Sequence, residues 1–327
     1  MQKILPCLLA KYNKQKTVLV AAAAVEGSVY TNIKKDDLMK RYGNIFEKIV
    51  DIDNIMLAHK KARRDKSHYI EVQMVDKDPR KYAEEIQKML IDGTYEVGEY
   101  KRSIIIDGGK ERELMKLPYY PDRIIQWAIM LQIEDIFLNK FIDQTCASIP
   151  KRGIHRAWQF MQKYLKDKEG TKYCLKLDVK KFYPSIDKDI LKKMLTDTFK
   201  DDKLLELLYK IIDSYPEEKG VPIGSYLSQY FGNFYLHGLD HYIKERLGVK
   251  YYIRYMDDMA ILGEDKDRLR FVMYQIQDYL NYYLRLELKG NYQIFPTRVR
   301  GVDFVGYRFF GDYTLLRKSI CKNFKKK

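Results

Sequence analysis

One stretch of the sequence decides the fold: Tyr251–Gly263, which reads YYIRYMDDMAILG. The residues on both sides of its centre are strand-forming or apolar, and the centre carries two adjacent acids, Asp257 and Asp258. This pattern predicts a β-hairpin whose tight turn presents two carboxylates. Acids on a turn often only satisfy nearby backbone N–H groups. Apolar strands on both sides favour a hairpin packed on a core, where fixed carboxylates suit a hard cation such as Mg²⁺.

A third acid comes from a second motif, Cys174–Ile186, which reads CLKLDVKKFYPSI. Its apolar residues predict a short strand with Asp178 at the end, followed by a turn at Pro184 and a helix. The alternative for Asp178 is an acid that only favours a helix N-terminus. The segment from Asp178 to Asp257 leaves room for a helical crossover, so the two acids can meet. Such a set can hold two Mg²⁺ ions about 4 Å apart, as polymerases do for in-line phosphoryl displacement.

Several segments resemble, in the right order, the motifs of the reverse transcriptases. The Asp178 motif and the YMDD hairpin resemble motifs A and C, and Gly220–Leu236 (GVPIGSYLSQYFGNFYL), between them, resembles motif B. Lys110–Ile129 (KERELMKLPYYPDRIIQWAI) resembles the fingers motifs, and Val302–Arg308 (VDFVGYR) resembles the primer grip, motif E. The resemblance extends over roughly Met39–Ser319. It implies an α+β right-hand polymerase with an antiparallel palm sheet backed by helices, an α/β fingers subdomain and a truncated thumb.

The resemblance also implies an activity, RNA-directed DNA synthesis by two-metal nucleotidyl transfer, with two Mg²⁺ ions or Mn²⁺ in their place. The residues that it implies as metal ligands are Asp178, Val179, Asp257 and Asp258. The implied catalytic residues are the same three acids and Lys289. The residues implied to bind the incoming deoxynucleoside triphosphate are Lys110, Arg112, Tyr183, Ile223, Gly224 and Gln229.

Individual roles follow from the resemblance and from side-chain chemistry. Lys289 resembles the motif D general acid for the pyrophosphate leaving group, with a plain surface lysine as the alternative. Tyr183 corresponds to the aromatic that stacks under the sugar and excludes a 2′-hydroxyl by overlap, so that the product is DNA. Lys110 and Arg112 are expected to clamp the triphosphate, or else are exposed turn charges. Gly224 permits close approach of the backbone to a nucleotide.

Motif B indicates a subclass. Ser228-Gln229 resembles the reverse transcriptases of diversity-generating retroelements, whereas group II intron enzymes usually carry Gln-Gly in that loop. Ile223 replaces the Gln of many retroviral-type enzymes, so discrimination rests on shape alone and fits misincorporation opposite adenine; the alternative is a packed apolar residue.

This resemblance implies error-prone cDNA copied from a template-repeat RNA. The implied partners are the RNA template, a DNA or RNA primer, and a small basic accessory variability protein that forms a multimer. Two alternatives stay open: a defence-associated (anti-phage) bacterial reverse transcriptase, and a non-catalytic RNA-binding relic.

The composition agrees with a nucleic-acid partner. The 327 residues include 60 Lys+Arg against 45 Asp+Glu, a formal net charge of +15. Such an excess favours a polyanion, because neutralised phosphates release counterions; lysine-rich solubility is the alternative. The four cysteines lack CxxC spacing, so neither a zinc site nor a disulfide framework is indicated and a reducing cytoplasm fits. No apolar run is long enough to span a bilayer.

The expected domain division follows the motifs. Residues 1–38 are expected to be an N-terminal extension or mobile arm, because Met39 begins MKRYGNIFEKIV in the manner of many bacterial reverse transcriptases. Residues 39–170 are expected to form the fingers, 171–312 the palm, and 313–327 a basic remnant of the thumb. A short thumb would leave primer–template binding to a partner.

Local signals predict the main elements. A hairpin is expected over Tyr95–Leu117, turning at Gly108-Gly109. The helices are expected over Tyr42–Arg64 with a break, Pro79–Ile91, Asp122–Asn139, Ser225–Arg246 and Arg268–Tyr283. His237 and His241 lie one helical turn apart, a metal-ligand spacing, but no third ligand lies nearby in the sequence, so a polar helix face is favoured.

Overall fold

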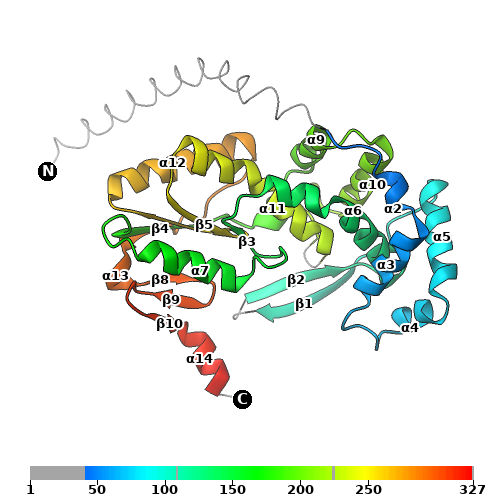
Figure 1. The fold of residues 1–327 in the computed structure, drawn as a ribbon, viewed down its shortest axis with the longest axis horizontal. Coiled ribbons are helices and arrows are strands. Elements are labelled where there is room, and N and C mark those ends of the chain that lie inside the picture. The colour runs from blue at the N-terminus through cyan, green and yellow to red at the C-terminus, as the bar shows by residue number, and fades with distance from the viewer. Residues whose placement is uncertain (1–40, 108–109, 223–224, 326–327) are drawn as a thin grey trace, which may run out of the picture.

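The computed structural model describes residues 41–107, 110–222 and 225–325 (Figure 1). At its centre lies a five-stranded sheet in the order β3-β5-β6-β4-β7. The strands are β3 (Thr145–Cys146), β4 (Tyr173–Asp178), β5 (Tyr251–Tyr255), β6 (Asp258–Gly263) and β7 (Gln293–Pro296). All neighbouring strands are antiparallel except β3 and β5, which are parallel. The predicted antiparallel sheet is therefore confirmed, with one short parallel strand at its edge.

Helices cover the sheet and form a second body beside it (Figure 1). The helices that precede β4 in the chain are α2 (Phe46–Ile49), α3 (Ile52–Ala62), α4 (Ile70–Lys77), α5 (Pro79–Ile91), η2 (Tyr119–Arg123), α6 (Ile124–Lys140) and α7 (Ile154–Leu165). Those between β4 and the β5–β6 hairpin are α8 (Phe182–Ser185), α9 (Lys188–Thr198), α10 (Asp202–Asp213), α11 (Tyr226–His241) and η3 (Tyr242–Arg246). The later ones are α12 (Lys266–Tyr283), α13 (Thr297–Arg300) and α14 (Lys318–Lys325).

The two faces of the central sheet bury different apolar clusters, as the alternation of side chains along a strand requires. Leu175 and Leu177 of β4 belong to the larger cluster, which includes residues of α11 and α12. Cys174 of the same strand belongs to a second cluster, which includes residues of α7. In Figure 1, α11 and α12 lie above the sheet and α7 lies below it. The sheet is thus a middle layer with apolar residues packed on both faces. Polar functional residues are therefore expected at the ends of its strands.

Helix beginnings follow the capping signals of the sequence closely. Asp78 accepts a hydrogen bond from the backbone N–H of Lys81 at 3.2 Å, and α5 then runs over the predicted Pro79–Ile91. Five other helices also begin at a side-chain cap: Asp51, Asp187, Asp201, Ser225 and Asp265. The predicted helix over Tyr42–Arg64 is present as α2 and α3, with the expected break between them.

Helix α6 differs from the amphipathic helix predicted for this segment. Its first half is apolar around most of its circumference: Ile124, Ile125, Ala128, Ile129 and Met130 are each at most 1% exposed, and Trp127 and Leu131 on the other face are partly buried. It lies against α3 and against α11, which cover most of that half. An apolar stripe with period 3.6 predicts one buried face, and only the tertiary arrangement shows that the opposite face is partly covered too.

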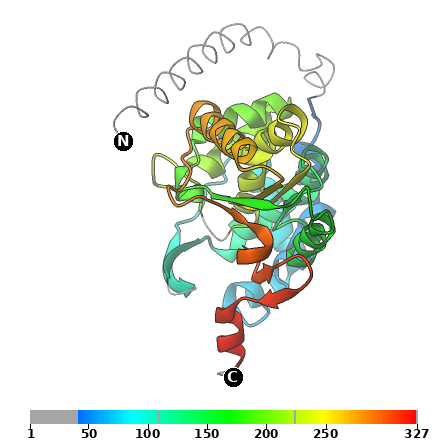
Figure 2. The same cartoon turned by 90° about the vertical axis from the view of Figure 1, so that its left-hand side faces the viewer.

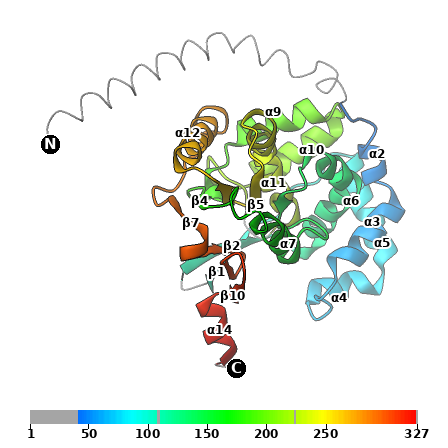
Figure 3. The same ribbon diagram turned by 60° about the vertical axis from the view of Figure 1, so that its left-hand side comes forward.

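Two small β elements flank the layers. The predicted hairpin is present as β1 (Lys101–Asp107) and β2 (Lys110–Lys116), and its turn at 108–109 lies outside the described residues. A three-stranded sheet is formed by β8 (Val302–Phe304), β9 (Tyr307–Phe309) and β10 (Thr314–Leu316). Figure 2 shows the β1–β2 hairpin standing out from the body, and Figure 3 shows α14 pointing away from it. No helix in the described part of the chain combines the length and apolarity needed to cross a membrane.

Candidate active site

The predicted acidic hairpin is present at the centre of the sheet. Strands β5 and β6 pair in antiparallel register, with Tyr255 opposite Asp258. The two-residue turn between them consists of Met256 and Asp257, and Met256 has a left-handed backbone conformation with φ of 54°. A non-glycine residue holds that conformation only where its surroundings fix it. The turn therefore has a defined shape rather than a flexible one.

The third acid lies beside this turn, as predicted. Asp178 is the last residue of β4 and stands directly opposite Asp258 in the neighbouring strand. Asp257 and Asp178 lie within side-chain hydrogen-bonding reach. Burial, and next the charge of Asp178, raise the pKa of Asp257 to about 6. Burial likewise raises the pKa of Asp258, partly offset by Lys176. Three carboxylates from two motifs therefore meet in one place.

Two lysines face the acids. The ammonium group of Lys176 pairs with Asp258 Oδ1 and also lies 4.5 Å from the centre of the Phe304 ring on β8. Lys289 Nζ donates to Asp178 Oδ1 at 2.7 Å, and its backbone N–H donates to the carbonyl of Asp178 at 2.8 Å. Lys289 therefore lies next to the three acids, as expected for a lysine that acts at the same site.

The donor chemistry of this cluster fits a hard divalent cation. Carboxylate oxygens are the ligands that Mg²⁺ prefers, and a cation between Asp178 and Asp257 would relieve the repulsion that raises the pKa of Asp257. Two of the three acids are, however, paired with lysines, Asp258 with Lys176 and Asp178 with Lys289. Within residues 41–107, 110–222 and 225–325, no three His, Cys, Asp or Glu side chains form a ready metal cage.

Tyr183 and Val179 also lie at this site. The hydroxyl of Tyr183 lies 3.5 Å from the sulfur of Met256, and burial, followed by the charge of Asp257, raises its pKa. Gly232 of α11 makes room for the tyrosine, because a Cβ there would stand 3.3 Å from the ring. Val179 is fully buried, and its N–H donates to the carbonyl of Asp257 at 3.4 Å. The chain segment after Asp178 is thus tied to the turn.

The other nucleotide-binding candidates are placed less fully. Ile223 and Gly224 lie outside the described residues. Lys110 and Arg112 lie on β2, but their side chains are not described. Gln229 is partly exposed near the beginning of α11, whose Ser225 cap donates to Gln126 Oε1 of α6 at 2.8 Å.

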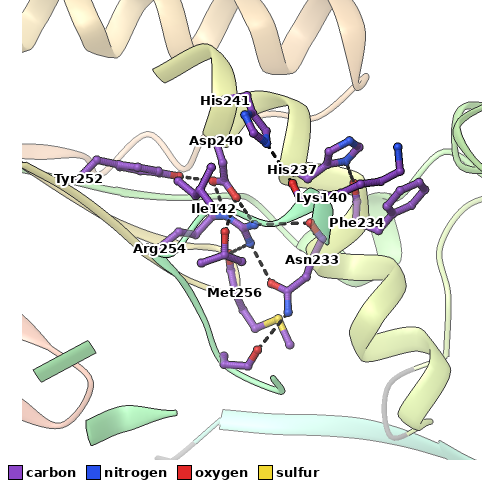
Figure 4. Close-up of polar contacts among 12 residues, drawn as sticks. Lys140, Ile142, Asn233, Phe234, His237, Asp240, His241, Tyr252, Arg254 and Met256 are labelled. Carbon is purple, nitrogen blue, oxygen red and sulfur yellow. Dashed lines mark hydrogen bonds and ion pairs between the residues drawn. The ribbon is translucent and has the colours of Figure 1, made fainter. Parts of the chain in front are cut away.

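The two histidines of α11 form hydrogen bonds with backbone and side-chain partners (Figure 4). His237 Nδ1 donates to the carbonyl of Phe234 at 2.5 Å. Both ring nitrogens of His241 are engaged, by Glu245 at 2.5 Å and by the carbonyl of Lys140 at 2.9 Å. Each histidine is therefore held by hydrogen bonds to nearby groups, and the polar helix face stays a prediction.

Sequence reasoning missed a buried ion pair directly behind the acidic turn. Arg254 of β5 and Asp240 of α11 are both fully buried and pair at 2.5 Å (Figure 4). Asn233 joins them from the same helix face, two turns before Asp240. An arginine inside an otherwise apolar strand, and polar residues at a seven-residue spacing on a buried helix, were the available signals.

Comparison with known proteins gives separate evidence on the family of this chain. The family model described as reverse transcriptase (RNA-dependent DNA polymerase) matches residues 101–309. The group II intron-encoded protein LtrA of Lactococcus lactis subsp. cremoris is 28% identical over 172 residues, which cover 49% of this chain and 28% of that protein. Protein YkfC of Escherichia coli (strain K12) is 24% identical over 167 residues, covering 48% of this chain and 44% of that protein. The chain thus matches less than half the length of each of these relatives.

Solved structures show the same fold at low sequence identity. Apo telomerase from Candida tropicalis superposes with a TM-score of 0.50 and 13% identity, over 68% of this chain and 49% of that chain. Telomerase from Candida albicans, in complex with a fragment of telomeric RNA, gives a TM-score of 0.50 and 12% identity, over 68% and 47% of the two chains. Because the family model covers more than half of the sequence, the chain belongs to the reverse transcriptase family.

Proposed function

We propose that this protein is an RNA-directed DNA polymerase. The observation that carries the proposal is the meeting of Asp178 with Asp257 and Asp258, from motifs far apart in the sequence, beside Tyr183 and Lys289. An RNA template and a primer would lie over the end of the sheet that carries these three acids. The positive net charge of +15 favours such a polyanionic substrate.

We assign metal binding to the three acids and to Val179. Asp178 and Asp257 would be the main ligands of two Mg²⁺ ions, and Asp258 would assist. Val179 has only a main-chain oxygen to offer, because its side chain is apolar and buried. When bound, the ions activate the primer 3′-hydroxyl and neutralise charge on the triphosphate. Lys176 and Lys289 now pair with Asp258 and Asp178, so metal binding would require both ion pairs to open.

The remaining residues are assigned to the nucleotide. Lys289 would donate a proton to the pyrophosphate leaving group, since it already lies next to Asp178. Tyr183 would lie under the sugar and exclude a ribose hydroxyl. Those assigned to the triphosphate and the base, from the sequence alone, are Lys110, Arg112, Ile223, Gly224 and Gln229. Residues 39–170 would act as fingers and 171–312 as palm.

Asp257→Ala tests the metal assignment directly. We expect primer extension on an RNA template to fall by at least about 10³-fold, or about 4 kcal/mol, because the metal site would lose a carboxylate ligand. RNA binding, measured by fluorescence anisotropy, should stay within about twofold, since the fold is kept. The matched control is Asp278→Ala, which removes an exposed acid on α12. Extension by Asp257→Ala at the rate of this control would refute the assignment.

We further propose that the polymerase serves a diversity-generating retroelement and copies a template-repeat RNA with errors. The Ser228-Gln229 pair and Ile223 support this subclass, and a small basic multimeric accessory protein would be its partner. Ile223→Gln should lower misincorporation opposite adenine, because a side-chain amide restores hydrogen-bond discrimination. Sequencing of cDNA made by both proteins on one template is the measurement. An unchanged error spectrum would count against this subclass and leave the polymerase assignment intact.

A further inference from the structure

The buried cluster behind the acidic turn uses the full hydrogen-bonding capacity of one arginine (Figure 4). Arg254 donates from Nε and Nη2 to the two oxygens of Asp240, at 2.7 and 2.5 Å. It donates from Nη1 to Asn233 Oδ1 at 3.1 Å and to the carbonyl of Met256 at 2.9 Å. A fifth bond, from Nη2, reaches the carbonyl of Asn233 at 3.4 Å. All five guanidinium N–H groups are therefore satisfied inside the protein.

The acid that holds Arg254 is itself fixed by two further side chains, one on β5 and one on β3. Asp240 accepts a hydrogen bond from the hydroxyl of Tyr252 on β5 at 2.6 Å and one from Thr145 on β3 at 2.8 Å. Burial lowers the pKa of Arg254, but the charge of Asp240 and the hydrogen bonds outweigh it, so the net direction is upward and the guanidinium stays charged. The cluster is a fixed bracket that joins α11 to two strands.

The bracket reaches the acidic turn at its strained residue. Met256 is the left-handed residue just before Asp257 and Asp258, and its carbonyl is the acceptor for Arg254. Its N–H donates to the carbonyl of Cys146 at 3.3 Å. Asn233 extends the same bracket, because its Nδ2 donates to the carbonyl of Ala147, another left-handed residue, at 3.0 Å. Both peptide segments around the turn are thus held by one set of side chains.

Stability alone does not account for such a bracket. Removing two charges from water costs several kcal/mol per ion, and apolar replacements of buried ion pairs are often neutral or stabilising. The bond from Arg254 to Met256 is the only contact of this pair, among the described residues, that reaches the turn itself. We propose that Arg254, held by Asp240 and Asn233, is a positioning residue that orients the carboxylates of Asp257 and Asp258 for cation binding. The proposal rests on the polymerase function and deepens it.

The test uses a double variant that removes both buried charges at nearly constant volume, Arg254→Met with Asp240→Asn. Thermal unfolding, Mn²⁺ binding followed by water-proton relaxation without nucleic acid, and kcat and KM for single-nucleotide extension are measured. We expect an unfolding midpoint within a few degrees of wild type. The Mn²⁺ dissociation constant should rise, and kcat should fall, by about 10–100-fold, as for other residues that orient metal ligands. KM for the nucleotide should change little.

Two further variants make the result decisive. Tyr164→Phe is the matched control: it removes a buried 2.9 Å hydrogen bond to the carbonyl of Tyr252 on the same strand and leaves the turn untouched. It should lower the midpoint without weakening Mn²⁺ binding. Arg254→Lys keeps a positive charge next to Asp240 but loses the planar guanidinium that reaches Met256. This variant should fold, and its affinity for Mn²⁺ should be lower than that of the wild type. It therefore tests the proposal even if the double variant does not fold.

The outcomes separate this inference from the proposed function. Wild-type Mn²⁺ affinity in a folded Arg254→Lys or double variant would overturn the positioning role. Asp257→Ala shows which part of the relaxation signal comes from the turn, so the binding measurement stands even if the wild-type protein extends no primer. Absence of extension by the wild type would overturn the polymerase function and leave the positioning result readable.

Discussion

At the scale of single residues, Lys289 makes the contact that most directly links the site to chemistry. Its ammonium group donates to Asp178 at 2.7 Å, and its backbone is bonded to the same residue. Lys289→Met should lower kcat for extension by about 10²-fold, the lower end expected for loss of a general acid. Rapid-quench kinetics would measure it. Lys180→Met, which loses only an exposed pair with Glu287, is the control.

A second variant separates proton donation from charge. Lys289→Arg keeps the positive charge next to Asp178 but donates a proton poorly, because the guanidinium pKa is above 12. If Lys289→Arg extends primers at the wild-type rate, the lysine acts only as a counter-charge and the general-acid role is wrong.

The candidate site could be predicted from the sequence where its residues follow one another in short motifs. Asp178, Asp257 and Asp258 each stand at a strand end or turn, and their flanking apolar residues identify the strands. Arg254 and Asp240 could not be paired in the same way. Their contact depends on how α11 lies across β5, and a charged residue in a strand is ordinarily read as exposed.

At the scale of elements, the crossing of α6 and α11 joins the helical body to the sheet. Phe137 of α6 is fully buried, with ring centroids 4.8 Å from Phe234 and 6.2 Å from Tyr230, both on α11. Phe137→Ala should lower the free energy of unfolding by about 3–5 kcal/mol, because it leaves a cavity at this crossing. Urea unfolding would measure the change. Tyr282→Ala, at a position 81% exposed on α12, should change it by less than about 0.5 kcal/mol. Equal losses would show that the crossing is not a stability centre.

Element boundaries could be predicted where capping chemistry is local. Asp78 and Pro79 define the beginning of α5 within one turn, without help from the rest of the molecule. The partial burial of the second face of α6 could not be predicted, because a periodic pattern reports one apolar face and says nothing about how many neighbours a helix has. The parallel edge strand β3 was also beyond reach, since it is only two residues long.

At the scale of the whole molecule, a fall in pH should destabilise the fold, and one buried histidine, His237, contributes to that loss. The pKa of His237 is lowered from its ordinary 6.5 to about 4, chiefly by burial and in smaller part by the charges of Lys140 and His241, while the Phe234 carbonyl and Asp240 act in the opposite direction. Below pH 6.5 the His237 side chain becomes protonated in the unfolded chain, while it stays neutral in the folded chain until the pH approaches 4. The folded state therefore loses up to about 1.4 kcal/mol per pH unit, and no more than about 3 kcal/mol in total, between pH 6.5 and 4.

The measurement is urea unfolding at several pH values for wild type and His237→Phe. The difference between the two proteins removes the contribution of all other groups, including His241, whose pKa is raised and whose contribution has the opposite sign. The variant should show a shallower loss over this window. Parallel curves would mean that His237 does not stay neutral in the fold.

The order of strands in the central sheet has a consequence for synthesis on the ribosome. β4 lies between β6 and β7, so both of its neighbours are translated after it. Asp178 can pair with Asp258 only after Asp258 has been synthesised, which takes roughly 4–16 s more at a translation rate of about 5–20 residues per second. During that interval the nascent strand, with Leu175 and Leu177, has neither edge paired. Chaperone protection of this segment should therefore matter more for yield than protection of the helices made before it.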